Sequence, residues 1–131
     1  MMKKLYLISV IIFTLTLPSA SNAEWTEIVR NESGSVFYLN TKTIKENRIT
    51  KYFYILVDYA NPNSYGDLSA KAYIELNCSN MMVRHLVVDY FRYPLGDGDP
   101  TEGSGQISNP EWKFYPPESA YGLLNAFVCD Y

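Results

Sequence analysis

Apolar and polar residues alternate along much of the chain, with the period of two that is typical of β-strands packed on one face. The pattern is clearest in residues 69–78, "SAKAYIELNC". One face of this segment is lined by small and apolar residues, namely Ala70, Ala72, Ile74, Leu76 and Cys78. The opposite face is mainly polar and includes Tyr73. The segment therefore predicts a strand with Cys78 on the core side.

Four further segments have strand composition or alternation: 24–30, 36–40, 49–60 and 81–93. Residues 49–60 are apolar on both faces, which indicates an interior strand. In residues 81–93, Leu86, Val88 and Tyr90 form one predicted face. Arg84 falls on that same face, where a charge is unfavourable. The connections are too short for helical crossovers, so neighbouring strands should run antiparallel.

The segments between the predicted strands are polar and rich in residues that favour turns. Residues 41–48 predict a turn with Glu46 and Asn47 at its tip, and residues 61–67 predict a polar loop. Residues 94–111, "PLGDGDPTEGSGQISNPE", have no periodicity and predict a long surface loop.

The last segment, "PPESAYGLLNAFVCDY", changes to helical spacing. Pro116 and Pro117 suit a helix start, and Glu118 would favour the helix dipole from the first turn. An apolar stripe for the sheet is predicted at Ala120, Leu123, Leu124, Phe127 and Val128. The order of elements predicts an α+β fold with an antiparallel sheet and one C-terminal helix packed on it.

The N-terminus has the build of a secretory signal peptide: a basic start, an apolar run over residues 5–17 and small residues before Ala23. We expect residues 1–23 to be cleaved after Ala23, leaving residues 24–131 as a single domain. The alternative is a membrane anchor, but the run is shorter than the roughly 20 residues that a spanning helix needs. No cysteine follows it for a lipid anchor, so we expect an exported protein with no stable membrane anchor.

The chain has two cysteines, Cys78 and Cys129. In an oxidising compartment one intramolecular bridge is the default, worth about 4 kcal/mol in the chain-entropy description. An intermolecular bridge and two free thiols are the alternatives. Helical geometry puts Cys129 near the far side of the predicted stripe, so we expect the helix to unwind before it, with a bridge at the helix rim as the other option. Two cysteines and one histidine cannot complete a zinc site.

The formal net charge is −3, and removal of Lys3 and Lys4 with the leader would make the remaining domain more acidic. Nucleic acids and anionic membranes are therefore not expected as partners, because both need a basic face. The mild acidity favours solubility.

The sequence provides little support for catalysis, a metal or a cofactor. His85 is the one histidine, and no nucleophile motif accompanies it. Asp97, Asp99 and Glu102 are close together, but glycine and glutamate are missing from the positions that an EF-hand loop requires. A looser calcium loop and a solvated acidic loop are the two interpretations. We expect no enzymatic activity.

Tyrosine is the compositional anomaly, with 12 residues in the chain. Tyr52, Tyr54 and Tyr73 fall on predicted strand faces opposite the core. One explanation is that tyrosine suits strands. The other is an aromatic face for a protein partner or a second subunit, because tyrosine is enriched at interfaces. These three residues are the candidate partner-binding face.

Several short stretches, spread over the whole domain, resemble the surface-adhesin protein E family of Gram-negative bacteria. They are "WTEI", "VFYLNTKTI", "YFYILVDY", "YIELNC" and the closing "W…PPES…LLNAFVC". The resemblance implies a sheet of about six strands with a C-terminal helix, a Cys78–Cys129 disulfide and dimerisation. It also implies an adhesin that binds host extracellular-matrix proteins such as vitronectin and laminin, and plasminogen. The alternative function is a soluble periplasmic structural, stress or inhibitor protein with no host ligand.

Overall fold

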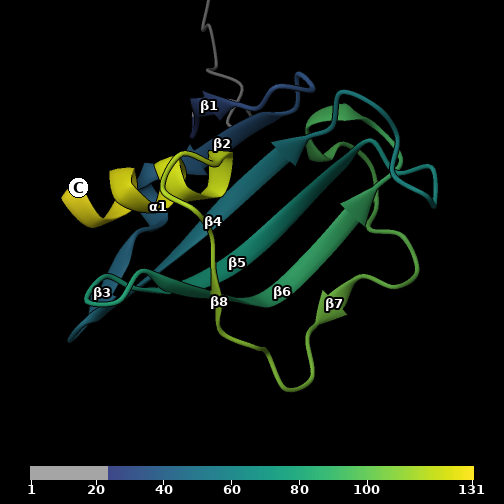
Figure 1. Cartoon of the computed structure of the whole chain (residues 1–131). Helices are drawn as coiled ribbons and strands as arrows, with labels where there is room; N and C mark the ends of the chain where they lie inside the picture. Colours follow the sequence, from purple (N-terminus) through teal and green to yellow (C-terminus); the bar gives the residue numbers. More distant parts are fainter. Residues whose placement is uncertain (1–23) are drawn as a thin grey trace, which may run out of the picture.

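The computed structural model describes residues 24–131. The predicted signal peptide, residues 1–23, lies outside the described residues. Figure 1 shows the elements, which are β1 (Trp25–Arg30), β2 (Val36–Asn40), η1 (Thr41–Thr43), β3 (Lys45–Asn47), β4 (Thr50–Asp58), β5 (Ser69–Asn77), β6 (Met82–Phe91), η2 (Pro94–Gly96), β7 (Gly105–Gln106), β8 (Lys113–Phe114) and α1 (Ala120–Asp130). The five strands that alternation predicted are all present.

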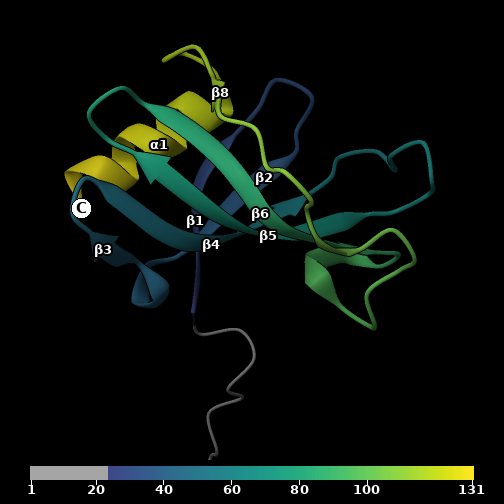
Figure 2. The ribbon, with the colours of Figure 1, turned by 90° about the horizontal axis from the view of Figure 1, so that it is seen from below.

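All the strands belong to one antiparallel sheet with the order β1-β2-β4-β5-β6-β7. The two remaining strands add no further positions across the sheet. Strand β3 pairs with β4 beyond the end of β2, and β8 pairs with β6 beyond the end of β7. The eight strands thus occupy six positions across the sheet, which confirms the expected fold and its size. Helix α1 covers one face of the sheet, and Figure 2 shows the two layers edge-on. We call the face that α1 covers the inner face.

The inner face of the central strands carries the core. Phe53 and Ile55 of β4 and Ile74 and Leu76 of β5 are fully buried, with 0% of each side chain exposed. The β4–β5 register pairs Phe53 with Ile74, so these apolar residues are cross-strand neighbours on the same face. The alternation predicted for these two strands is therefore confirmed.

In β6, the predicted grouping of Arg84 with Val88 on one face was wrong. Its pairing with β5 shifts between Tyr73 and Ile74, so that Leu86 is an extra residue between His85 and Val87. Such a β-bulge reverses the alternation on either side of itself. Arg84 consequently pairs with Glu75 on the outer face, whereas Val88 pairs with Ala72 on the inner face. The unfavourable position predicted for Arg84 was wrong, because uniform alternation ignored the bulge.

Helix α1 begins at Ala120, later than the composition indicated. Ser119 is the N-cap, and its hydroxyl oxygen accepts a hydrogen bond from the Gly122 N–H at 3.1 Å. Glu118 precedes the helix, so its predicted place in the first turn was wrong. A side chain at Gly122 would meet the Pro116 carbonyl oxygen at 2.0 Å. The glycine therefore lets the proline segment lie directly on the first turn.

The helix buries a narrower stripe than predicted. Leu124 and Val128 are fully buried, and Asn125 is buried beside them. Leu123 and Phe127 remain 49% and 41% exposed, so their assignment to the sheet face was wrong. The buried face runs through Tyr121, Leu124, Asn125 and Val128, which follow one another at the spacings of three and four that place residues on one side of a helix. It is rotated by about one residue from the expected stripe.

A disulfide joins Cys78 at the end of β5 to Cys129 in the last turn of α1, with the two Cα atoms 5.7 Å apart. The helix continues to Asp130, so the predicted unwinding before Cys129 was wrong. Because the buried stripe is shifted, Cys129 lies at its edge and can be reached from β5. The Lys51 ammonium also donates hydrogen bonds to the Val128 and Cys129 carbonyl oxygens, at 3.0 and 3.4 Å.

Two connecting segments contain more structure than expected. Residues 41–48 include η1 and β3 rather than a simple turn, and residues 94–111 include η2 and β7. Within residues 24–131, no helix is both long and apolar enough to cross a membrane.

Candidate functional site

The structure brings the three predicted site tyrosines together on the outer face, opposite α1. The rings of Tyr54 and Tyr73 are stacked with centroids 4.5 Å apart, and those of Tyr52 and Tyr73 are 6.1 Å apart. Tyr54 is 43% exposed, and the other two are half-buried. We call Tyr52, Tyr54 and Tyr73 the outer tyrosine surface. Their adjacency follows from the β4–β5 register, which pairs Tyr54 directly with Tyr73.

A buried carboxylate fixes one end of this surface. Glu75 is 5% exposed, and it accepts hydrogen bonds of 2.6 Å from the Tyr52 hydroxyl and from Arg84 Nε. The bond to Glu75 raises the pKa of Tyr52 above its ordinary value, so this hydroxyl stays protonated. The Arg84 guanidinium in turn lies 4.4 Å from the centroid of the Trp112 ring. The aromatic surface thus extends from β4 to the residue before β8.

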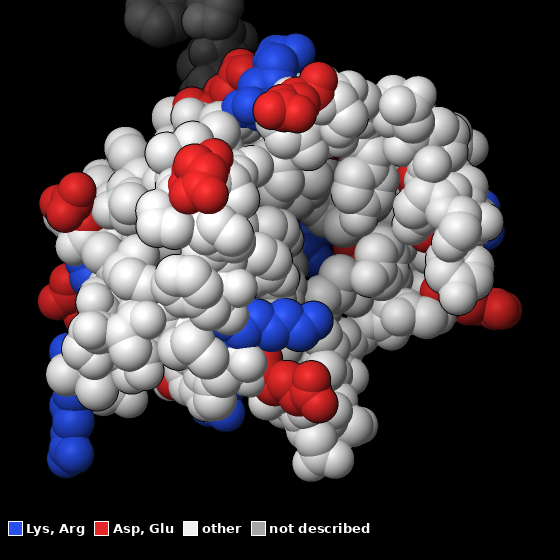
Figure 3. Space-filling model, in the orientation of Figure 1, with Lys and Arg blue, Asp and Glu red and all other residues white. Residues whose placement is uncertain are grey.

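A second candidate site is hollowed into the inner face beside α1. Three adjoining cavities of about 590, 510 and 280 Å³ share lining residues there. We call this hollow the helix-side trough, and it is lined by Phe37, Tyr59, His85, Tyr90, Tyr115 and Tyr121 among others. Figure 3 shows the molecular surface hollowed in this region.

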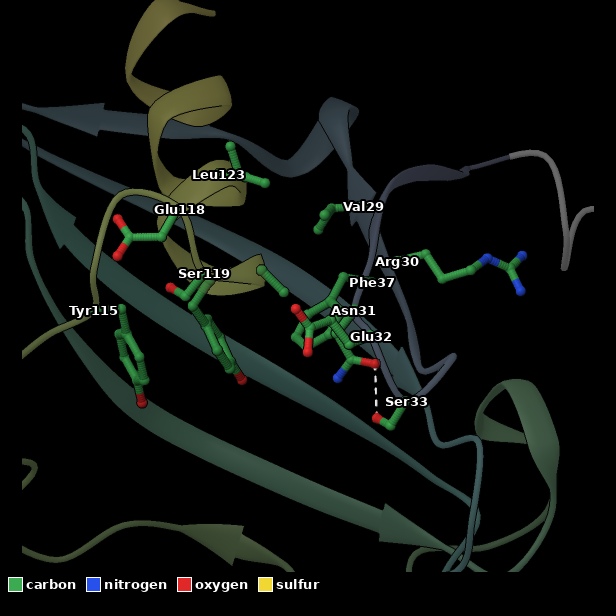
Figure 4. Close-up of a pocket in the computed structure, with 12 residues that line it drawn as sticks. Val29, Arg30, Asn31, Glu32, Ser33, Phe37, Tyr115, Glu118, Ser119 and Leu123 are labelled. Atoms are coloured by element: carbon green, nitrogen blue, oxygen red, sulfur yellow. Dashed lines mark hydrogen bonds between the residues drawn. The ribbon is translucent and has the colours of Figure 1, made fainter.

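The first of these cavities lies between the turn that joins β1 to β2 and the start of α1. Figure 4 shows Asn31 and Ser33 hydrogen-bonded to each other on one side and Glu118 and Ser119 on the other, with Arg30 pointing away. The Tyr115 and Tyr121 rings are stacked at 4.6 Å and form the aromatic wall towards the middle of the trough. The cavity combines an aromatic wall with a polar rim, as small-molecule sites commonly do.

His85 and Tyr121 form the polar contact inside the trough. His85 Nε2 lies 3.2 Å from the Tyr121 hydroxyl, its only hydrogen-bond partner among the described residues. Burial, with a contribution from Lys113, lowers the pKa of His85, and burial raises the pKa of Tyr121 well above its ordinary value. Both groups are therefore uncharged at neutral pH. Among the described residues, no carboxylate or serine is hydrogen-bonded to this pair, although Ser108 and Glu111 line the same cavity as His85.

The acidic loop gives no indication of a metal centre. No group of three or more His, Cys, Asp or Glu side chains within residues 24–131 is arranged to hold a metal ion. Asp97, Asp99 and Glu102 therefore do not form such a group in the part of the chain that the structure describes.

The helix-side trough was missed in the sequence because alternation assigns two of its tyrosines, Tyr59 and Tyr90, to core-facing strand positions. Both do belong to the inner face, because Tyr59 packs against the core and Tyr90 pairs with the buried Ala70. They line cavities because α1 covers only part of that face. The only sequence signal was the excess of tyrosine, which is distributed over both faces.

The fold and its surfaces define a disulfide-linked α+β protein with a solvent-facing aromatic sheet. The model of the family described as Surface-adhesin protein E matches residues 25–130, and the chain belongs to this family. The expected resemblance is thereby confirmed. No curated protein matches the chain.

Solved structures of Haemophilus influenzae protein E share the fold. Protein E from non-typeable Haemophilus influenzae has 15% identity and a TM-score of 0.62, with 86% of this chain and 80% of that chain covered. A second crystal form of Haemophilus influenzae protein E has 16% identity and a TM-score of 0.62, covering 86% and 92%. A further protein E structure has 17% identity and a TM-score of 0.61, covering 88% and 91%.

Proposed function

We propose that this protein is a non-enzymatic, exported bacterial binding protein that attaches to a protein partner through the outer tyrosine surface. Membership of the surface-adhesin family supports an adhesive role, and host matrix proteins such as vitronectin and laminin are the proposed ligands. The observation that carries the proposal is the contiguous aromatic surface on the side of the sheet opposite α1. Export after cleavage at Ala23 is part of the same proposal.

The chemistry of the surface suits protein recognition. Tyrosine, tryptophan and arginine are the residues that most often dominate binding energy, because they combine a large apolar area with a polar tip. Here Tyr54 and Trp112 are 43% and 38% exposed, and Arg84 is held between Glu75 and Trp112. The side chains that would contact a partner are thus already ordered, which reduces the entropy cost of binding.

Binding of residues 24–131 to immobilised vitronectin, laminin and plasminogen tests the proposal. The Tyr54→Ser, Trp112→Ser double variant should weaken binding at least about tenfold, because it removes two exposed rings and leaves the Glu75 hydrogen bonds intact. Tyr131→Ser is the matched control, because Tyr131 is 65% exposed and lies at the end of α1, on the other side of the sheet from the outer tyrosine surface. Equal binding by the double variant and the control would contradict the assignment of the surface.

Two further measurements separate this proposal from its alternatives. Cell fractionation should find the protein on intact cells, whereas a strictly periplasmic location would favour a structural, stress or inhibitor protein without a host ligand. Light scattering of the purified domain tests whether the same aromatic face pairs with a second copy. A dimer that the Tyr54→Ser, Trp112→Ser variant abolishes would assign this surface to self-association.

A further inference from the structure

A cavity of about 690 Å³ lies beyond the end of the trough, between the 61–67 segment and residues 101–103. Its walls are held by hydrogen bonds. Asn63 Oδ1 accepts from the Asp67 N–H at 2.9 Å, and the Asn63 carbonyl accepts from the Gly66 N–H at 3.0 Å. The opposite wall is joined to β6, because the Thr101 N–H donates to the Tyr90 carbonyl at 2.8 Å. The cavity is therefore formed before any ligand binds.

A buried carboxylate in this cavity has unused hydrogen-bonding capacity. Asp67 is 3% exposed, and its Oδ2 accepts a hydrogen bond of 3.2 Å from Asn63 Nδ2. Its Oδ1 has no hydrogen-bond partner among the described residues and is held only by an ion pair with Arg92, whose Nε lies 3.5 Å away. Buried oxygens without a partner are rare, because leaving one unsatisfied is unfavourable. Asp67 Oδ1 thus keeps capacity for one more hydrogen bond, which a ligand hydroxyl can use by inserting beside the Arg92 side chain.

The charges around the cavity favour a neutral ligand. A bound anion would meet the carboxylates of Asp67 and Glu102, and a bound cation would meet the Arg92 guanidinium. Arg92 is held in place, because it also donates a hydrogen bond to the Tyr65 carbonyl oxygen. Acceptors and donors are both present, and a hydroxyl group can pair with either kind.

Two aromatic rings complete the site. Tyr65 and Tyr90 line the cavity, and Tyr65 is 78% exposed. An exposed ring offers an apolar face to a ligand that carries C–H groups on one side and hydroxyls at its edge. A pyranose ring has this combination.

We propose that this cavity binds a neutral saccharide. A sugar hydroxyl donates to Asp67 Oδ1, the Asn63 and Arg92 N–H groups donate to sugar oxygens, and the sugar ring packs on Tyr65. The site is independent of the outer tyrosine surface, because Tyr90 lies on the inner face of the sheet, where it pairs with Ala70. Protein binding and saccharide binding can therefore fail separately.

Saturation-transfer NMR on residues 24–131 tests the proposal, with lactose, maltotriose and diacetylchitobiose as neutral probes at millimolar concentration. Glucosamine and N-acetylneuraminic acid are the cationic and anionic comparisons. At least one neutral probe should bind. Tyr65→Ala should weaken its binding about five- to tenfold, and Asp67→Asn should weaken it as well. Tyr93→Ala is the matched control, because Tyr93 is 61% exposed and lies outside the cavity.

The outcomes separate clearly. Binding of a neutral probe that Tyr65→Ala weakens and Tyr93→Ala leaves unchanged supports the site. Binding of the charged sugars alone, no binding of any neutral probe, or equal loss in Tyr65→Ala and Tyr93→Ala overturns it. Circular dichroism checks the fold of each variant. If Asp67→Asn unfolds the domain, the comparison of Tyr65→Ala with Tyr93→Ala decides.

Discussion

Removal of the disulfide by the double substitution Cys78→Ala and Cys129→Ala should lower the free energy of unfolding by about 4 kcal/mol. The bridge joins residues that are 51 positions apart. In the chain-entropy description, closing a loop of this length removes about 14 cal/mol/K from the unfolded ensemble, which is about 4 kcal/mol at 25 °C. For a domain of this size the melting temperature should fall by about 15–20 °C.

The folded state should survive the substitution, because other contacts hold the helix on the sheet. Leu124 and Val128 are fully buried, and Lys51 donates to the last carbonyls of α1. The loss should therefore arise mostly in the unfolded state, which becomes more expanded without the bridge. An increase in the denaturant m value together with the lower midpoint is the expected signature.

Urea unfolding of residues 24–131, followed by tryptophan fluorescence and circular dichroism, measures this effect with and without reductant. Reduction should lower the stability of the wild-type domain to that of the double variant. The double variant is its own control, because reductant should leave it unchanged. A loss below about 1 kcal/mol, or a reductant effect on the double variant, would refute the entropic argument.

Three further changes test other contacts by the same unfolding measurement. Gly122→Ala should destabilise the domain by about 2 kcal/mol or more, because the new methyl group would lie 2.0 Å from the Pro116 carbonyl oxygen. This clash should outweigh the gain in helix propensity from alanine. A neutral or stabilising result would show that the proline segment moves freely. Lys51→Met should cost about 1 kcal/mol, because it removes the cation from the C-terminal end of α1, and an unchanged midpoint would contradict this role. Because burial lowers the pKa of His85 below its ordinary value of 6.5, the unfolded state binds this proton more readily, so stability should fall as the pH drops through about 6.5. His85→Gln should remove this part of the pH dependence, and an identical profile in the variant would assign it to other groups.

The strands were predictable because alternation depends only on neighbouring residues and on which of them are apolar. Residues 69–78 illustrate this, since the predicted core face is the observed one. The bulge at Leu86 was not predictable in this way, because the extra residue is defined by the pairing of β6 with β5. The misplaced face of Arg84 followed from that single shift in register.

The helix shows the same limit. Its existence follows from the 3 and 4 spacing of its apolar residues, but several stripes fit that spacing. The one that is buried depends on how the helix docks, and the close approach of Pro116 at Gly122 forms part of that docking. Leu123 and Phe127 therefore remained exposed, although their positions in the sequence suited burial.

One of the candidate binding surfaces could be predicted from the sequence, and the other two could not. The outer tyrosine surface could be predicted, because period-two alternation places Tyr52, Tyr54 and Tyr73 on one side of two adjacent strands. The helix-side trough and the cavity at Asp67 could not, because they depend on how far α1 covers the sheet and on where the loops fold back.

The sequence by itself determined the class of fold, the five main strands, the two cysteines available for a bridge and the family, because these depend on local periodicity, composition and short motifs. The tertiary structure alone decided the register of β6, the buried side of α1 and the positions of the cavities. Those features arise where segments distant in the chain pack together. Their geometry is set by which contacts fill space best, and no local pattern records that.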